Sequence, residues 1–516
     1  MKRLLALLCI LCTLTGCFYV DGAYEPTGDG LSADIDDPDA SLPSENQQEQ
    51  DLVMVCYYDV TMNPYLCTDF TNRTIFSLLY QGLFITDSDY QTYPLLCSRY
   101  TMSDDMKRYT IYLADATFPD NSPVTVEDVL ASYTAAKASS YYKGRFTHIR
   151  EFKISEEGDA IIFTLSTAME DLPILLDIPI IKAEEVEADR PMGTGAYYLD
   201  ETAIGMRLRR KKNWWCGDTA TLPVTASQIL LREAESVTQI RDAFQFSDVG
   251  LVRADPGTSA YADYRCDYEL WDCENGSFMY LICNTERNLF SIPAVRQALT
   301  HVIDRELLVE KYYNGFARAA YLPASPLSPY YSELLAERYT YDKAAFRQAI
   351  VDAGMSGYVM EFLVNDKDTL RLRVARTIAQ MLEECGLHVT MVECSGTEYQ
   401  YHLGKQHFDL YLGQSVLSPN MDLSPFFSAS GRLRHGGLAD AAIHALCLES
   451  LANSGNYYNL HQMVMEDAKL CPVLFSVYSV HATRGLLTGL EPAREQVFFY
   501  TLGTTMKDAL FYEYDD

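Results

Sequence analysis

The sequence has 516 residues, of which 48% are hydrophobic and 22% are charged, and its formal net charge at pH 7 is −30. This composition is typical of a globular chain, and at roughly 100–200 residues per domain the length allows three or four folding units. The acidity excludes binding to a nucleic-acid backbone, which requires clustered Lys and Arg, so no nucleic-acid partner is expected.

The first residues carry a targeting signal. Lys2 and Arg3 precede an apolar run over residues 4–14, and the tetrad LTGC that ends at Cys17 resembles the lipobox of bacterial lipoproteins. The apolar run spans about 16 Å as a helix, too short for a hydrocarbon core of about 30 Å. The sequence therefore predicts a lipoprotein signal peptide over residues 1–16 and a lipid on Cys17 that anchors the protein to the outer side of the cell membrane. An ordinary secretory signal is the alternative.

Residues 17–50 follow this signal and are rich in Gly, Pro, Ser, Asp and Glu, which is typical of a flexible tether. Of the 14 cysteines, Cys9 and Cys12 lie in the signal peptide and Cys17 is acylated, so 14 − 3 leaves eleven. An odd number excludes a complete disulfide framework, and most of these thiols are expected as small buried side chains. Cys266 and Cys273 are close enough in sequence to permit one bridge.

From residue 51 the pattern alternates between strands and helices. In the first half, residues 52–55, 109–113 and 161–165 are predicted strands, and Thr125 with Asp128 predicts the start of a helix.

In the second half, residues 278–283 are a predicted strand, followed by a helix with Ser291 as its N-cap and Pro293 in its first turn. Residues 359–364, 374–385 and 387–391 then form a predicted strand-helix-strand unit, whose helix ends at Gly386. This alternation predicts α/β lobes with mainly parallel sheets and ligand sites beyond the strand ends.

The sequence lacks the common catalytic and cofactor motifs. It contains no G-x-S-x-G elbow, P-loop, dinucleotide-binding glycine motif or HExxH helix. His402 and His407 are five residues apart, which does not place them on one helical face, and the sequence around Gly193 to Gly195 indicates a turn before a strand. We expect no metal, no cofactor and no enzymatic activity. The 37 tyrosines fit a binding protein, because their rings combine apolar surface with a polar group.

A series of short segments then appears in a characteristic order. In chain order they are Asn63-Pro64, LYQGLF at 79–84, YTIYL at 109–113, PVTVEDV at 123–129, GTGAY at 193–197, KNWW at 212–215, YLICN at 280–284, VRQAL at 295–299, IDRE at 303–306 and AG at 353–354. This series resembles the family 5 extracellular solute-binding proteins, which include dipeptide-, oligopeptide- and nickel-complex-binding proteins. The resemblance covers residues 51–492.

The resemblance implies an α/β fold of the periplasmic-binding-protein type II, with two lobes and an extra subdomain. The first lobe would comprise residues 51–279 and 479–516, and the second lobe residues 280–478. Crossings near residues 280–284 and 477–481 would form a hinge. The implied function is capture of a small peptide-like ligand by a monomer for the permease of an ABC importer.

The resemblance also implies where the ligand lies. Three segments are expected to contact it, namely residues 57–61, 253–255 and 413–418, and the first and third would offer backbone groups to an extended ligand. The charged candidates for the ligand's ends are Asp59, Arg253, Asp255 and Asp422, and Tyr58 is expected to form an apolar wall. The full set of candidate residues is Tyr58, Asp59, Thr61, Arg253, Asp255, Gly413, Gln414, Ser415, Ser418 and Asp422.

One position departs from the family pattern. Where the peptide binders carry an Asp that holds the ligand's α-amine, this chain has Ser418, and Asp422 is the candidate substitute. A hydroxyl does not supply the charge-assisted hydrogen bond that a free ammonium group favours. Alternatives to a simple peptide are a modified peptide, an opine-like compound and an oligosaccharide. Alternatives to import are a signalling receptor for a peptide pheromone and a surface peptidase or glycosidase.

Overall fold

The computed structural model describes residues 52–203, 205–217, 220–256, 264–487, 489–499 and 501–502. These residues fall within one compact unit, Glu49–Asp516. The predicted signal peptide, Cys17 and the tether lie outside the described residues. Within the described part, no helix combines the length and the apolar character needed to span a membrane.

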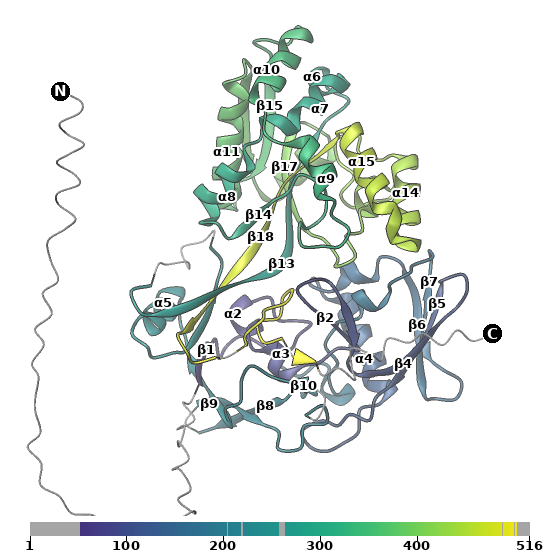
Figure 1. Ribbon diagram of the computed structural model, residues 1–516, viewed down its shortest axis with the longest axis vertical. Helices are drawn as coiled ribbons and strands as arrows, with labels where there is room; N and C mark the ends of the chain where they lie inside the picture. Colours follow the sequence, from purple (N-terminus) through teal and green to yellow (C-terminus); the bar gives the residue numbers. More distant parts are fainter. Residues whose placement is uncertain are drawn as a thin grey trace, which may run out of the picture. The chain divides into compact units, whose positions relative to one another are not determined.

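A large mixed sheet forms the centre of this unit (Figure 1). Its strands are β1 (Leu52–Cys56), β8 (Tyr197–Thr202), β9 (Gly205–Arg210), β11 (Gln228–Glu233), β12 (Leu251–Ala254), β13 (Tyr268–Cys283), β14 (Ala317–Ala319), β15 (Val359–Asn365), β16 (His388–Cys394), β17 (Leu410–Val416) and β18 (Leu470–Thr483). Their order is β16-β15-β17-β13-β18-β12-β1-β11-β9-β8, and β14 pairs with β18.

Most neighbouring strands in this sheet are antiparallel. The parallel pairs among the described strands are those of β1 with β11 and β12 and those of β15 with β16 and β17. The prediction of mainly parallel sheets is therefore wrong. The physical reason is that β13 and β18 run through the middle of the sheet in opposite directions and pair along most of their length.

The strands β13 and β18 connect two groups of elements, and Figure 1 shows them side by side. One end of β18 pairs with β12, while one end of β13 pairs with β17. The register places Tyr280 opposite Pro472 and Val477 opposite Glu274. The register breaks twice, between Glu274 and Ser277 and again between Met279 and Tyr280, and the second break lies at the first predicted crossing.

The group of elements around β15, β16 and β17 is covered by helices. These are α6 (Asn288–Ser291), α7 (Pro293–Val302), α8 (Arg305–Tyr313), α9 (Glu333–Ala336), α10 (Lys343–Asp352), α11 (Thr369–Glu383), α12 (Gly396–Gly404), α13 (Ser424–Phe427), α14 (Ala441–Ala452) and α15 (Tyr457–Asp467), with short 3-10 turns η5 (Glu337–Tyr339) and η6 (Ser454–Asn456). The predicted unit β15-α11-β16 is confirmed, and its strands are parallel. Apolar side chains of α7, α11 and β15 share one buried core.

The other group contains the remaining elements. A four-stranded antiparallel sheet has the order β4-β5-β7-β6, and α4 contacts β6 and β7. The bounds are β2 (Phe84–Thr86), β3 (Thr92–Pro94), β4 (Cys97–Met102), β5 (Arg108–Leu113), β6 (Ile149–Ile154), β7 (Ala160–Leu165), β10 (Ala220–Thr221), β19 (Thr501–Leu502), α2 (Phe70–Arg73), α3 (Phe76–Leu79), α4 (Val126–Ala138), α5 (Val237–Gln245), η2 (Lys143–Phe146), η3 (Pro173–Leu175) and η4 (Ala183–Glu185).

Two predicted helix starts have different outcomes. Thr125 and Asp128 form a reciprocal capping box at the start of α4, as predicted. The Ser291 prediction is wrong, because Ser291 ends α6 and its Oγ donates to the Asn288 carbonyl at 2.8 Å. The N-cap of α7 is Ile292, without a side-chain hydrogen bond, and Pro293 opens the helix. A proline at this position lacks an N–H, so the first turn has one donor fewer to satisfy.

The cysteines from Cys56 onward are free thiols, and all are buried except Cys266, which is half-buried. The bridge between Cys266 and Cys273 is not formed. Burial raises the pKa of the Cys97 thiol to about 12, so it is protonated and unreactive at neutral pH. The prediction that these cysteines serve as small core residues is confirmed.

Candidate functional site

A cavity of about 280 Å³, partly open to solvent, lies beside the end of β17. One wall consists of residues 414–419 with Arg432 and Leu433, and the other of Ser140, Tyr141, residues 143–145, Arg494 and Glu495. We call it the cleft cavity. Its walls come from both of the element groups that β13 and β18 connect.

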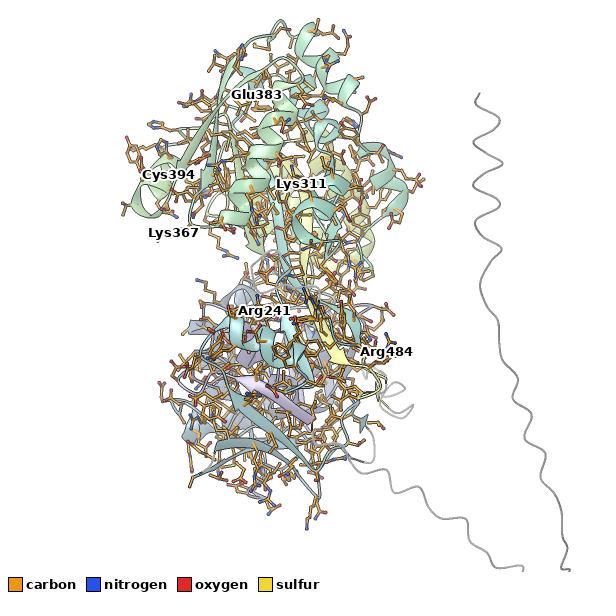
Figure 2. The ribbon with its side chains drawn as sticks, turned by 90° about the vertical axis from the view of Figure 1, so that its left-hand side faces the viewer. Arg241, Lys311, Lys367, Glu383, Cys394 and Arg484 are labelled. Carbon is orange, nitrogen blue, oxygen red and sulfur yellow. The ribbon has the colours of Figure 1, made fainter. Side chains whose placement is uncertain are left out.

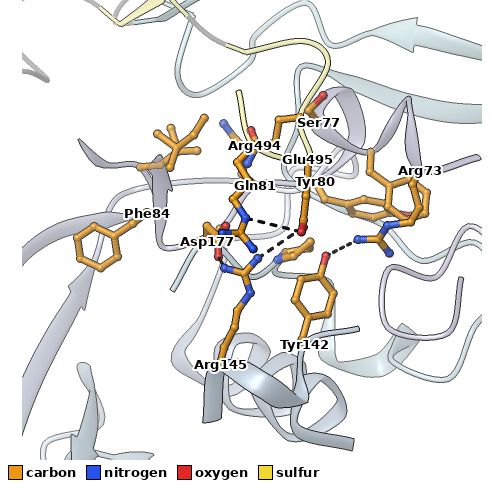
Figure 3. A pocket seen from close by; sticks show the side chains of 16 residues that line it. Arg73, Ser77, Tyr80, Gln81, Phe84, Tyr142, Arg145, Asp177, Arg494 and Glu495 are labelled. Carbon is orange, nitrogen blue, oxygen red and sulfur yellow. Dashed lines mark hydrogen bonds and ion pairs between the residues drawn. The ribbon is translucent and has the colours of Figure 1, made fainter. Parts of the chain in front are cut away.

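A second cavity of about 50 Å³, the inner cavity, lies between α3, η2 and the segment after β18 (Figure 3). Arg145, Arg494 and Glu495 line both cavities, so the two share a wall. The inner cavity is further lined by Arg73, Phe76, Ser77, Tyr80, Gln81, Gly82, Phe84, Ile85, Leu95, Tyr142, Asp177, Pro179 and Gln496.

The two cavities are rich in cationic side chains, although the whole chain carries a net charge of −30. Lys143, Arg145, Arg432 and Arg494 line the cleft cavity, against a single carboxylate, that of Glu495. Positive groups that surround a low-dielectric cavity concentrate their field inside it. The cleft cavity therefore favours a ligand with negative charge.

Arg145 is held by two carboxylates. Its guanidinium forms a hydrogen-bonded ion pair with Asp177, and its Nη2 lies 3.6 Å from Glu495 Oε2. Figure 3 shows both contacts meeting at the wall of the inner cavity. Burial raises the pKa of Asp177, and the charge of Arg145 lowers it without offsetting that rise.

Arg494 joins the two walls of the cleft. Its Nη2 donates to the carbonyl of Leu417, the residue just after β17, while its Nε lies 3.9 Å from Glu495 Oε1. Arg494 is 6% exposed, and its Nε and Nη1 have no hydrogen-bond acceptor among the described residues. A buried cation is thus left with unused donors at the shared wall.

Comparison with known proteins identifies the family. Residues 91–433 match the family model described as bacterial extracellular solute-binding proteins, family 5 Middle. The chain belongs to this family. Family 5 proteins serve ABC importers as two-lobed extracellular binding proteins, and they are not enzymes.

Three similar proteins illustrate the relationship. The oligopeptide-binding protein AppA of Bacillus subtilis is 24% identical over 420 residues, which cover 74% of this chain and 77% of AppA. The glutathione-binding protein GsiB of Salmonella paratyphi A is 23% identical over 353 residues, which cover 63% of this chain and 66% of GsiB. The ABC transporter-associated binding protein DppA of Helicobacter pylori, solved with the peptide STSA, has a TM-score of 0.62 at 18% identity, covering 88% and 98% of the two chains.

The third predicted segment of this family 5 protein lies at the cleft cavity. Gln414, Ser415 and Ser418 line it, while Gly413 pairs with Tyr280 of β13. A Cβ atom at position 413 would lie 2.4 Å from the ring of Tyr280, so only glycine fits. The Gln414 side chain donates to Ser277 Oγ at 2.6 Å, and the Ser418 hydroxyl donates to Asn420 Oδ1 at 2.7 Å.

Asp422 lies near this segment but lines neither cavity. Its carboxylate accepts hydrogen bonds from the Ser424 N–H and hydroxyl, both at 2.8 Å, and lies 3.0 Å from His148 Nε2. The side chain is therefore engaged within the protein. It does not present a free carboxylate in place of the Asp that is missing at Ser418.

The first predicted segment faces another part of the protein. The Tyr58 hydroxyl donates to the carbonyl of Leu231 in β11, and Thr61 Oγ1 donates to the Asp189 carbonyl at 2.9 Å. Asp59 is exposed. None of these three residues lines the cleft cavity or the inner cavity.

Arg253 and Asp255 lie at the end of β12 and after it. Arg253 is buried, with its guanidinium carbon 4.8 Å from the Tyr478 ring centroid, and it donates to the Phe70 carbonyl. Half-buried Asp255 follows two residues later. Neither residue lines either cavity.

The structure therefore brings together only the third predicted segment and several residues that sequence reasoning missed. The missed residues are Arg145, Arg494 and Glu495, with Arg73, Asp177 and Gln81 behind them. Arg145 belongs to the short turn η2, and the pair Arg494-Glu495 stands in an otherwise mostly apolar stretch. That charged pair is the one sequence signal that pointed to a buried polar site.

Proposed function

We propose that this family 5 protein captures a small peptide-like solute in the cleft cavity and delivers it to the permease of an ABC importer. The observation that carries the proposal is the cleft cavity itself, which lies between the two element groups and is lined by polar and cationic side chains from both. AppA is an oligopeptide-binding protein and DppA was solved with the peptide STSA, which supports a peptide as the solute.

The backbone of β17 supports an extended ligand. The pairing of β15 with β17 reaches only Leu410 and Tyr411, whereas β13 pairs with β17 as far as Val416. The far end of β17 therefore has strand pairing on one edge among the described strands, and its other edge can accept a peptide by strand addition. Gln414, Ser415 and Ser418 would supply polar contacts there.

We also propose a domain organisation for this mechanism. Residues 51–279 and 479–516 form the first lobe and residues 280–478 the second. The hinge lies at the boundary between Met279 and Tyr280, where the register with β18 breaks, together with the neighbouring break between Glu274 and Ser277. A break in the ladder concentrates the bending in few residues, because the paired strands on either side keep their hydrogen bonds.

The function is tested by peptide capture with a blocked cleft. The soluble protein from residue 18 onward is incubated with an equimolar tripeptide mixture, and native mass spectrometry detects what it retains together with any solute that co-purified. Gly144 lines the cleft, and a Cβ there meets only the tip of Arg432 at 4.0 Å, so Gly144→Trp fills the cavity. We expect Gly144→Trp to lose capture and Gly404→Trp, a control in open space on α12, to retain it.

If the wild-type protein retains no peptide, or if Gly144→Trp captures as well as Gly404→Trp, the proposal is wrong. Co-purification of an oligosaccharide or opine-like compound instead would assign a non-peptide solute. Uptake of the labelled solute is then compared between cells with and without the gene. Loss of uptake without the gene indicates import, because an importer requires its binding protein, whereas unchanged uptake indicates a signalling role.

The lipid anchor is a further part of the proposal. Only the thiol of Cys17 can form the thioether to diacylglycerol, so Cys17→Ala should carry no lipid and be either unprocessed or released from the membrane. Cells are grown with labelled fatty acid and the protein is recovered from membrane and medium fractions. Label on the Cys17→Ala protein would contradict the lipobox assignment.

A further inference from the structure

The charges on the two walls of the cleft cavity are mostly positive. Lys143, Arg145 and Arg494 line one wall, and Arg432 lines the opposite wall. Lys143 and Arg432 are exposed, and neither takes part in an ion pair among the described residues. Positive groups on both sides of a cavity repel a further cation that enters it. A ligand with an ammonium group would therefore need a carboxylate of the cleft to compensate for this repulsion.

Glu495 is the one carboxylate among the described residues that line the cleft cavity, and its charge is already used. Its Oε2 lies 3.6 Å from Arg145 Nη2, and its Oε1 lies 3.9 Å from Arg494 Nε. Figure 3 shows both arginines converging on this carboxylate. A carboxylate between two guanidinium groups leaves a net positive charge around it, so it does not attract an ammonium group.

The backbone holds Glu495 in this position. The residue lies at the tip of a tight turn whose ends, Ala493 and Gln496, pair as an antiparallel bridge. Its φ is +63°, a left-handed conformation that residues other than glycine adopt rarely, and its N–H donates to the Glu274 carbonyl at 2.7 Å. Such a conformation persists only where the surroundings fix it. We therefore expect Glu495 to stay with its two arginines when a ligand binds.

The opposite wall contributes polar groups that are also engaged. Ser418 donates its hydroxyl hydrogen to Asn420 Oδ1 at 2.7 Å, and Gln414 Oε1 accepts from Arg371 Nη2 at 3.1 Å. Asp422 lines neither cavity and is satisfied within the protein. An ammonium group has three donors and binds most strongly to charged acceptors. The described walls of the cleft offer no charged acceptor that is not already paired.

We infer that the protein prefers solutes without a free ammonium group, and that peptides with a blocked N-terminus are the preferred class. This inference rests on the proposed function, because it assigns a substrate class to the solute held in the cleft cavity. An N-acyl group replaces the ammonium with a neutral amide, which can join the strand addition along β17. Its carbonyl accepts hydrogen bonds, and Lys143 and Arg432 are suitable donors. Peptides with a free N-terminus bind as well, but more weakly.

The test compares two peptides that differ only at the N-terminus. The probes are Ala-Ala-Ala and N-acetyl-Ala-Ala-Ala, each titrated into the soluble protein by calorimetry at about pH 6, where the free amine is protonated. Both probes have the same C-terminal carboxylate, so this group does not contribute to the difference. We expect the acetylated peptide to bind at least about tenfold more tightly, because it brings no positive charge into the cleft.

A second titration separates the charge of the amine from the contacts of the acetyl group. An α-amino group has a pKa of about 7.7–8.0, so it loses its charge when the pH is raised from about 6 to about 9.5. The affinity for Ala-Ala-Ala should then rise about tenfold toward that of the acetylated peptide. The affinity for N-acetyl-Ala-Ala-Ala should change by less than about twofold, because arginine side chains stay charged over this range.

The matched variant is Ser418→Asp, which adds a carboxylate to the wall of the cleft. Asn420 can accommodate it by turning its amide so that the NH₂ group donates to the new carboxylate. We expect the preference for the acetylated peptide to fall at least about tenfold at pH 6. Ser430→Asp is the control, because Ser430 is exposed and lines neither cavity, and it should keep the wild-type preference.

The outcomes separate this inference from the proposed function. If both peptides bind the wild-type protein equally at pH 6, peptide capture stands and the preference for a blocked N-terminus is overturned. If Ala-Ala-Ala does not gain affinity at high pH, the acetyl contacts and not the charge cause the preference, and the charge argument is overturned. If neither peptide binds, the proposed function fails and the inference fails with it.

The variants test where the N-terminus lies. Equal preferences in Ser418→Asp and Ser430→Asp would overturn its placement in the cleft beside Ser418. Circular dichroism checks that both variants fold. If Ser418→Asp does not fold, the pH titration of the wild-type protein decides the inference, since it needs no variant.

Discussion

Asp422 and His148 form a buried contact between segments that are 274 positions apart in the sequence. Burial by itself would raise the pKa of Asp422, but the hydrogen bond and charge of His148 and two hydrogen bonds from Ser424 hold it below its ordinary value. A carboxylate with a lowered pKa stabilises the folded state at pH values above its unfolded pKa of about 3.9, and this contribution disappears as the pH falls through the folded value.

This pairing predicts an acid-sensitive contribution to stability. Asp422→Asn should lower the free energy of unfolding at pH 7 by about 1.5–3 kcal/mol, the usual value of a hydrogen bond to a charged group. The difference from the wild type should shrink as the pH is lowered below about 4, because the wild-type carboxyl then becomes protonated. Denaturant unfolding at pH 7 and pH 3 measures both quantities.

A control is available in the exposed ion pair between Asp267 and Arg484, whose side chains are 74% and 59% exposed. Asp267→Asn should change the free energy of unfolding by less than about 1 kcal/mol, because solvent screens exposed pairs. Equal effects of the two substitutions at pH 7 would contradict the role assigned to burial at Asp422.

Among the elements, the register break in β13 between Glu274 and Ser277 also affects the position of Arg494. Gly276 lies at the break with φ +66°, a left-handed conformation that favours glycine, and a Cβ there would lie 2.0 Å from Arg494 Nη2. The break thus leaves room for the guanidinium that lines both cavities. Gly276 would thus connect the proposed hinge with the proposed binding site.

The variant Gly276→Ala tests this connection against Gly354→Ala. Gly354 has the same φ of +66°, but no atom lies within 4 Å of its built Cβ. Both variants should lose about 1–2 kcal/mol of stability from the left-handed conformation. Only Gly276→Ala should also weaken peptide binding, since Arg494 must move. Calorimetry measures the affinity of both variants for a peptide that the wild-type protein captures. Equal peptide affinity in Gly276→Ala and Gly354→Ala would contradict the link between Gly276 and Arg494.

At the scale of the whole molecule, several contacts cross between the two element groups. Besides Arg494 with Leu417 and His148 with Asp422, the Glu170 N–H donates to the Leu451 carbonyl at 2.8 Å, and the Ser454 N–H donates to Glu170 Oε2 at 2.9 Å. In the proposed hinge motion these contacts would separate as the two lobes open. Ligand binding would then shift the protein toward the state in which they are formed.

We therefore expect ligand binding to make the protein more compact without changing its secondary structure. Small-angle scattering should show a smaller radius of gyration at saturating peptide, while the far-ultraviolet circular dichroism stays constant, because closure changes only a few hinge dihedrals. Gly144→Trp, which blocks the cleft, should show no ligand-dependent change. An unchanged radius of gyration in the wild type at saturation would contradict the closure.

Local sequence patterns were sufficient to predict several elements and the family. The capping box at Thr125 was predictable because Thr followed three residues later by Asp can exchange hydrogen bonds with the helix N-terminus. The unit β15-α11-β16 was predictable because a helix or strand that buries one face must repeat its apolar residues at a matching period. The ordered motifs reached the family 5 assignment for the same reason, since each motif is local. Ser291 is not the cap because it ends α6 and its hydroxyl donates to the Asn288 carbonyl, which leaves Ile292 at the N-cap of α7.

Strand pairing and the contacts between distant charged residues could be established only from the three-dimensional fold. A strand's pattern shows which face is buried but not which strand lies beside it, so the antiparallel pairing of β13 with β18 was not predictable from periodicity. The predicted Asp422 was as reasonable in sequence as Arg494. Asp422 is nevertheless satisfied by His148 and Ser424, whereas Arg494 retains unused donors at a cavity, because hydrogen-bond satisfaction depends on neighbours that the fold brings from distant parts of the chain.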